Sequence, residues 1–336
     1  MKEEEFDLSD LLSTSSNALK GQVDSVTASL VIDCHCELGE GILYDDDRHA
    51  VQWTDILGKR FHRLQLTKEG EKGKVCLQTF DLPKELCSFG MVQGSTSVLL
   101  CAWEDGFDLY DIDKGQAVSE RSQGEDVNPK KGSSRLNDGR VDPTGNRFVC
   151  GGYYGEIPGV RMKVFRVQQD DDKKLFHEVI VEDMEVTNSI SWSLDGKKMY
   201  LADSPSHKIH CHDYDAKHGT VSNKTVLHEI DEALGVPDGS CVDAEGYLWN
   251  SVWRSGAGPA MVQRIDPVTG KVVYTVHVPG TSQVTCCCFG GEDMDILFIT
   301  SAAERRDPHI EPHAGGLYAV KLPFRGKKES RLQFTL

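Results

Sequence analysis

Four oxygen-bearing side chains stand at the same place in four similar segments of the chain, which suggests a shared chemical role. Each lies eight residues before the turn of its own segment; they are Glu40, Asn137, Asn188 and Asp238. Carboxylate and amide oxygens suit the hard cations Ca²⁺, Mg²⁺ and Mn²⁺, and Zn²⁺ also accepts carboxylates. Segments arranged around an axis would bring these side chains together. We therefore predict that these side chains contribute ligands to a divalent metal site.

The alternative for these four positions is a purely local role. Asn-Asp, Asn-Ser and Asp-Gly pairs are common in turns before strands, where their side chains bond the nearby backbone. That explanation suffices for any one of them, but the register shared by all copies favours a common site.

Three side chains, Asn137 among them, are predicted to bind substrate. Arg135 and Asn137 are separated by one residue of an expected strand, so their side chains leave on the same face. An arginine beside an amide is suited to bind the hydroxyls and carbonyl of a polyol, whereas the alternative is an ordinary surface arginine. Glu156 follows the glycine-rich turn of "GGYYGE", which could place a loop over the opening of a central channel.

The elements that position these residues recur with a fixed period. Turn signals followed by apolar or aromatic runs lie near residues 47, 94, 145, 196, 246 and 292. Intervals of this size are typical of a four-stranded propeller blade. We predict an all-β, six-bladed β-propeller with four-stranded antiparallel blades around a central, metal-containing channel. A β-sandwich does not predict such a period.

The expected boundaries follow from composition. Residues 1–24 are polar and rich in serine and glutamate, and we expect a disordered tail there. Residues 25–336 are expected to form a single propeller domain. Its first apolar run, "SVTASLVID" at residues 25–33, precedes the first blade and is expected to add a strand to the last blade, which would close the ring.

The charge of the chain limits its partners. The net charge is −16, which argues against nucleic acid as a partner because binding a phosphate backbone needs basic patches. The N-terminus has no apolar segment of the signal-peptide kind, and no run is long enough to span a membrane. A cytoplasmic protein is the default expectation, and the sequence does not determine its oligomeric state.

The eleven cysteines are odd in number, and three of them, Cys286–Cys288, are consecutive. Neighbouring strand residues point to opposite faces, so this pattern favours a reduced core over a disulfide framework. Cys34 and Cys36 could be taken for a zinc pair. Their one-residue spacer is shorter than usual for structural zinc and no second pair follows, so buried thiols are the preferred interpretation.

Several of these segments together resemble a known family. The strings "CHCELGEGILYDD", "SRLNDGRVDPTG", "TNSISWSLDGKKMYLADS" and "VPDGSCVDAEGYLW" are similar to the family that contains regucalcin (senescence marker protein), gluconolactonases and luciferin-regenerating enzymes. The resemblance runs from about residue 34 to residue 320. It implies a six-bladed propeller with one divalent cation in the channel.

The resemblance also implies roles for individual residues. The metal-ligand positions of the family fall on Glu40, Asn188 and Asp238. Its substrate-contacting positions fall on Arg135, Asn137 and Glu156. This chain departs from the family pattern at Ser189, where a glycine is usual, and at Asn250-Ser251, where small apolar residues are common. A serine beside the metal would be expected to alter the shape of the pocket.

The predicted function is metal-dependent hydrolysis of a sugar aldonolactone of the glucono- or gulonolactone type to the aldonic acid. Asp238 is predicted to be the general base as well as a metal ligand. The sequence contains no G-x-S-x-G, H-E-x-x-H, Walker or G-x-G-x-x-G motif. Two alternatives stay open: a calcium-binding regulatory protein of the regucalcin type, and a metal-dependent hydrolase of phosphotriesters.

Overall fold

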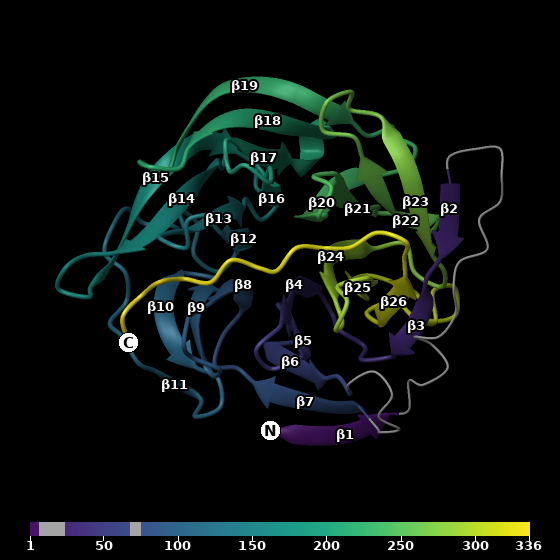
Figure 1. Ribbon diagram of the computed structural model, residues 1–336, viewed down its shortest axis with the longest axis horizontal. Coiled ribbons are helices and arrows are strands. Elements are labelled where there is room, and N and C mark those ends of the chain that lie inside the picture. Colours follow the sequence, from purple (N-terminus) through teal and green to yellow (C-terminus); the bar gives the residue numbers. More distant parts are fainter. Residues whose placement is uncertain (7–23, 68–74) are drawn as a thin grey trace.

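The computed structural model describes residues 1–6, 24–67 and 75–336. They form six antiparallel sheets of four or five strands around a central axis, which confirms the predicted six-bladed propeller (Figure 1). Among the described residues, no helix has the length and apolar character needed to cross a bilayer.

The innermost strands surround the channel and contact one another in cyclic order, so the ring is closed. They are β4 (Gly39–Asp45), β8 (Leu86–Met91), β12 (Arg135–Val141), β16 (Thr187–Trp192), β20 (Val236–Val242) and β24 (Val284–Gly290). The second strands are β5 (Ala50–Asp55), β9 (Val98–Trp103), β13 (Phe148–Tyr153), β17 (Lys198–Asp203), β21 (Leu248–Trp253) and β25 (Ile296–Ser301).

The strands of the two outer layers vary in length, and the outermost strands are the more exposed of the two. The third strands are β6 (Arg60–Gln65), β10 (Gly106–Asp111), β14 (Met162–Gln169), β18 (Lys208–Asp215), β22 (Ala260–Ile265) and β26 (Leu317–Lys321). The outermost strands are β7 (Val75–Asp81), β11 (Gln116–Ala117), β15 (Leu175–Met184), β19 (Thr220–Glu229), β23 (Val272–Val278) and β3 (Ser29–Ile32). A single turn of 3₁₀ helix, Ser204–Ser206, follows β17.

The chain closes its ring with an N-terminal strand, as expected. β3 pairs antiparallel with β26 and completes the sixth sheet. Just before it, β2 (Asp24–Thr27) pairs in parallel with β23 of the fifth sheet. The N-terminal segment therefore joins the last two blades to the first.

At the N-terminus the structure differs from the disordered tail predicted for residues 1–24. Lys2–Phe6 forms β1, which pairs with β7 as a fifth strand of the first sheet. This strand is held by backbone pairing and by a hydrogen bond from the Gln78 amide to Glu3 (2.9 Å). Its charged side chains carry no apolar alternation, which is why the sequence did not indicate it. The rest of the predicted tail, residues 7–23, lies outside the described residues.

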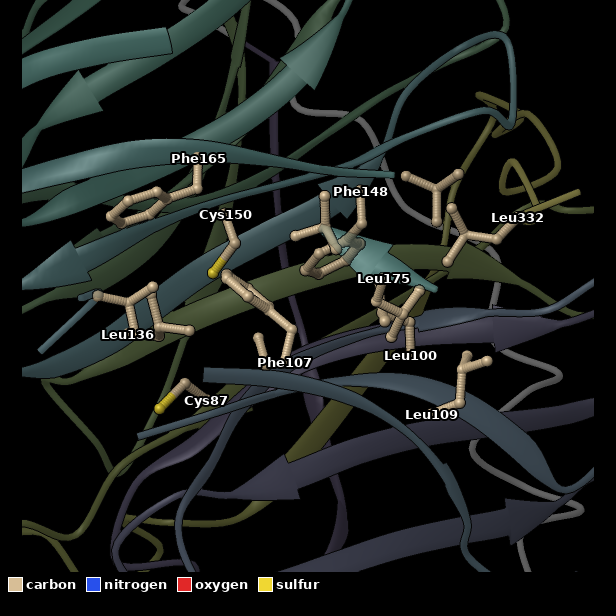
Figure 2. Close-up of a cluster of buried hydrophobic side chains, with 14 of the residues drawn as sticks. Cys87, Leu100, Phe107, Leu109, Leu136, Phe148, Cys150, Phe165, Leu175 and Leu332 are labelled. Atoms are coloured by element: carbon tan, nitrogen blue, oxygen red, sulfur yellow. The ribbon is translucent and has the colours of Figure 1, made fainter. Parts of the chain in front are cut away.

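Apolar side chains fill the space between neighbouring sheets. In the cluster between the second and third sheets, Phe107, Phe148 and Phe165 point toward one another from β10, β13 and β14 (Figure 2). All three rings are buried. Each blade is thus fixed by the face that it shares with the next blade, so the inner strands have little freedom to move relative to one another.

Residues 322–336, here called the C-terminal strap, cross one end of the channel, as the yellow trace in Figure 1 shows. Within the strap, Glu329 faces Arg140 (3.7 Å), and Arg331 donates a hydrogen bond to Asp45 (2.7 Å). Arg140 and Asp45 lie at the carboxyl ends of β12 and β4. The predicted site residues lie at the opposite, amino ends of the inner strands.

Replacing Arg331 by alanine should weaken this closure. The side chain is only 12% exposed and bridges Asp45 and Asp46, so its loss would leave a buried carboxylate without its cation. We expect the free energy of unfolding to fall by about 2 kcal/mol, measured by urea denaturation. In the control Lys328→Ala, which removes an exposed partner of Asp46, the loss should be much smaller. Equal effects of the two substitutions would contradict the prediction.

Candidate functional site

The structure brings all six predicted site residues to one cavity at the amino ends of the inner strands. Its volume is about 260 Å³. The six residues in its lining are Glu40, Arg135, Asn137, Glu156, Asn188 and Asp238. Apolar side chains, among them Tyr153 and Trp253, complete the wall. A concave, largely apolar cavity with a few convergent polar groups is the usual form of a small-molecule site.

A shared irregularity of the backbone aims the polar side chains inward. In β4, β12, β16 and β20 the register with the second strand shifts at the site residue, as in a β-bulge. In two of the four strands the following residue has a left-handed backbone: Gly41 with φ 58° and Ser189 with φ 60°. Bulges re-aim side chains at the ends of strands. This repeated bulge is the structural basis of the register seen in the sequence.

The amide and guanidinium groups of the site form a chain of hydrogen bonds. Arg135 Nη1 donates to Asn137 Oδ1 (2.5 Å), and Asn137 Nδ2 donates to Asn188 Oδ1 (3.1 Å). Asn188 Nδ2 donates to Ser204 Oγ (2.8 Å), which in turn donates to the Pro237 carbonyl (2.7 Å). These bonds fix the orientation of both amides and direct Asn188 Oδ1 to the side of the cavity.

The buried carboxyl groups of Glu40 and Asp238 line the cavity, and the half-buried Asp138 lies close enough to affect both. Burial and the neighbouring Asp138 raise the pKa of Glu40 to about 8. Burial and the nearby Glu40 raise the pKa of Asp238 well above its usual range, and burial raises the pKa of Asp138 as well. Asp238 Oδ1 is buried and has no hydrogen-bond partner among the described residues. Unpaired carboxylates in a dry site call for a positive charge.

These observations fit a divalent cation. The donors of Glu40, Asn188 and Asp238 are all oxygens, and a cation between them would relieve both the mutual repulsion of the carboxylates and the unpaired Asp238 Oδ1. The identity of the ion, whether Ca²⁺, Zn²⁺, Mg²⁺ or Mn²⁺, belongs to the proposal below.

The raised pKa of Glu40 predicts an unusual pH dependence for the metal-free protein. The folded-state pKa of about 8 lies above the ordinary value of 4.5, so this group stabilises the fold fully only below pH 4.5. The stability is lost as the pH rises toward 8. In chelator-treated protein we expect the melting temperature to fall by roughly 5 °C between pH 6 and pH 9. Glu40→Gln should reduce that fall without abolishing it, because Asp238 and Asp138 keep raised pKa values; an unchanged slope in this variant would contradict the assignment.

Arg135 and Glu156 occupy different depths of the site. The Arg135 guanidinium lies 4.7 Å above the centre of the Tyr153 ring and is buried. Glu156 has a left-handed backbone (φ 55°) and lies at the rim, where its carboxylate is 3.6 Å from Arg305 Nη1. Arg135 can therefore contact a ligand inside the cavity, whereas Glu156 can contact it only near the opening.

Ser189 does not shape the pocket, contrary to the expectation from its replacement of a glycine. Its side chain is fully buried between β16 and β20, where Oγ donates to the Asp238 carbonyl (2.9 Å). Asn250, the second departure from the family pattern, donates Nδ2 to Ser189 Oγ (2.8 Å) and to the Asp238 carbonyl (2.9 Å). The two departures thus form one network that holds the backbone of Asp238.

Two substitutions at Ser189 separate backbone strain from hydrogen bonding. Ser189→Ala keeps the left-handed backbone and removes the hydroxyl, and should cost about 2 kcal/mol of unfolding free energy because Asn250 loses an acceptor in the core. Ser189→Gly loses the same bonds but removes the strain of a non-glycine residue at φ 60°. The glycine variant should therefore be more stable than the alanine variant by about 1 kcal/mol in urea denaturation. The opposite order would refute this account.

Reasoning from the sequence missed several residues of the site. Ser204 and Trp253 follow or end second strands and reach the cavity only because of the blade geometry. Asp138 could have been identified from the sequence, since it directly follows Asn137 in "NDG". Its Oδ2 accepts a hydrogen bond from the Ile190 amide (2.8 Å), which ties β12 to β16 next to the carboxyl cluster.

Comparisons with known proteins agree with the fold. The SMP-30/gluconolactonase/LRE-like region matches residues 38–303. Regucalcin of Xenopus laevis is 31% identical over 313 residues, which cover 89% of this chain and 95% of that protein. The Bacillus subtilis protein YvrE, provisionally named as a sugar lactone lactonase, is 30% identical over 302 residues and covers 89% of this chain and 96% of its own.

Solved structures of the same kind are similar along nearly their whole length. The calcium-binding protein regucalcin of Agrobacterium tumefaciens is 25% identical with a TM-score of 0.77, covering 92% of this chain and 99% of that one. A luciferin-regenerating enzyme is 25% identical with a TM-score of 0.75, covering 91% and 99%. The chain belongs to the SMP-30/gluconolactonase/LRE-like family.

Proposed function

We propose that this protein is a metal-dependent lactonase that hydrolyses a sugar aldonolactone of the glucono- or gulonolactone type to the aldonic acid. The observation that carries the proposal is the buried Asp238 Oδ1, unpartnered among the described residues, beside Glu40 and facing a cavity of monosaccharide size. The name of YvrE supports a sugar lactone as the substrate class.

The residues present can hold the metal that the family implies. Glu40, Asn188 and Asp238 would be its protein ligands, and Ca²⁺, Zn²⁺, Mg²⁺ and Mn²⁺ are all compatible with their oxygen donors. When bound, such a cation supplies Lewis acidity that stabilises the negative charge developing on the lactone carbonyl oxygen.

Proton transfer and substrate binding are assigned to side chains of the protein. Hydrolysis adds water to the carbonyl carbon and breaks the ring carbon–oxygen bond, so one proton must leave the water and one must reach the ring oxygen. Asp238 is the proposed base, with Oδ1 as the atom that accepts the proton. Arg135 and Asn137 would bind hydroxyls inside the cavity, and Glu156 would bind one at the rim. The apolar wall near Trp253 would limit access of further water.

The test is a pH-indicator assay over a panel of aldonolactones, run on metal-stripped protein after addition of each metal in turn. Turnover of a five- or six-membered sugar lactone that depends on added metal supports the proposal. A phosphotriester included in the panel separates the alternative hydrolase, which would turn it over faster than any lactone. No lactone turnover with any of the four metals would overturn the proposal.

A second candidate is a calcium-binding regulatory protein. It is favoured by the relatives that are named regucalcin, one of which is described as a calcium-binding protein. The site offers this role only three protein ligands, two of them charged, which argues for weak Ca²⁺ affinity. Calorimetric titration of metal-stripped protein decides the matter: tight Ca²⁺ binding without lactone turnover would favour the regulator.

A further inference from the structure

A second group of metal-ligating side chains lies outside the channel, at the seam where the ring closes. Cys34 and Cys36 stand in the segment that leads from β3 of the last sheet to β4 of the first. His62 comes from β6 of the first sheet. Cys36 Sγ lies 3.6 Å from Cys34 Sγ and 3.7 Å from His62 Nε2.

These separations match those between ligands of one small ion. Two sulfur atoms bound to a tetrahedral zinc at about 2.3 Å lie about 3.8 Å apart, and a sulfur and a nitrogen lie about 3.5 Å apart. In addition, ligand atoms of Cys36, Asp55 and His62 all lie within 4.8 Å of one another. The donors of Cys36, Asp55 and His62 can therefore meet on a common centre without a large movement of the chain. Cys34 Sγ, which now donates to the Gly315 carbonyl (3.2 Å), would have to turn toward that centre from its place beside Cys36.

The imidazole is oriented for this role. His62 Nδ1 is hydrogen-bonded to Thr79 Oγ1 (3.1 Å), and the ring stacks on Trp53 with centroids 5.0 Å apart. A partner on one ring nitrogen orients the ring and leaves the other nitrogen to face a ligand, as is usual for metal-binding histidines. Here the nitrogen left over, Nε2, faces Cys36.

The charges also balance. Asp55 is already paired with Arg60, whose Nη2 lies 2.6 Å from Asp55 Oδ2. Two thiolates from Cys34 and Cys36 would neutralise a divalent ion, so the buried group carries no net charge. Asp55 Oδ1 accepts hydrogen bonds from the Leu38 and Gly58 amides, which holds the carboxylate beside Cys36 and His62.

We propose that Cys36, His62 and a carboxylate oxygen of Asp55 bind a zinc ion, with Cys34 as the fourth ligand. The site differs in chemistry from the channel, since thiolate and imidazole select softer ions than an all-oxygen set does. Its place in the fold gives it a structural role. The ion would fasten the ring-closing segment after β3 to the first blade.

Cobalt replaces zinc in the test because Co²⁺ bound to thiolates gives an intense charge-transfer band in the near ultraviolet. Oxygen and nitrogen ligands give no such band. Reduced, metal-stripped full-length protein is titrated with Co²⁺, then with Zn²⁺. We expect the band to appear with wild-type protein, to disappear when Zn²⁺ is added, and to be lost in Cys36→Ser and His62→Gln. It should persist in Glu40→Gln, which alters only the channel, and in the control Cys211→Ser, whose thiol lies in the fourth sheet.

Two results would overturn the proposal. One is the absence of the band in reduced wild-type protein, which would leave ordinary buried thiols. The other is a band that survives in Cys36→Ser and in Cys34→Ser, which would place the thiolate elsewhere. Because Cys36 is fully buried and Cys34 is half-buried, Cys34→Ser carries the test if circular dichroism shows that Cys36→Ser does not fold. Lactone turnover, which depends on the channel residues, is measured separately. The zinc proposal can therefore be refuted while the proposed lactonase function stands.

Discussion

Replacing Asp238 by asparagine is expected to lower kcat for lactone hydrolysis by roughly 10³-fold, the size of effect that follows from loss of a general base. The substitution keeps the shape of the side chain and removes the atom that would accept the proton from water. It also removes one of two charged ligands, so KM for the metal should rise as well. The measurement is steady-state turnover of the best lactone of the panel at saturating metal.

The fold should survive this change. Asp238 is buried with a raised pKa and an oxygen that lacks a partner among the described residues, so a neutral amide should leave the melting temperature of the metal-free protein unchanged or higher. The matched control is Asp213→Asn, an exposed aspartate paired with Lys198, which should keep wild-type turnover. Near-wild-type turnover in Asp238→Asn would rule out Asp238 as the base.

The second large effect is expected at Glu40. Glu40→Gln removes a carboxylate from the proposed ligand set and should weaken binding of the divalent cation by roughly 10²-fold. The physical reason is the loss of one full charge in a buried site, where the remaining donors are Asp238 and a neutral amide. Calorimetric titration of metal-stripped protein gives the dissociation constant directly.

Restoration of turnover by excess metal distinguishes a metal ligand from a structural residue. If Glu40 acts through the metal, saturating metal should restore much of the lost lactone turnover in Glu40→Gln. The control Glu229→Gln removes an exposed carboxylate of the fourth sheet, 3.8 Å from Lys208, and should leave the affinity unchanged. An unaltered dissociation constant in Glu40→Gln would contradict the ligand assignment.

Much of the fold could be predicted because each blade repeats one pattern of turn and apolar run. That repetition fixes the number of sheets and the innermost strand of each, and the apolar run at residues 25–33 correctly indicated a strand, β3, in the last blade. β1 was not predictable in this way. It consists mostly of charged residues and owes its place to a free strand edge on β7 rather than to a buried face.

The candidate site was predictable only in part, and the division has a physical origin. Glu40, Asn188 and Asp238 share a bulge that recurs in register, so the sequence repeat reports their position. Ser189 was misjudged because the left-handed backbone at this position turns its side chain between two strands, away from the cavity. His62 was missed because its approach to Cys36 depends on how the last sheet meets the first, which no local pattern describes.

The C-terminal strap affects how substrate and product reach and leave the cavity. Because Glu329 and Arg331 hold it across the ends of β12 and β4, the strap covers the end of the channel opposite the cavity. We therefore expect substrate and product to pass through the same mouth, beside Glu156. An incoming lactone would then have to wait until the acid made in the previous cycle has left.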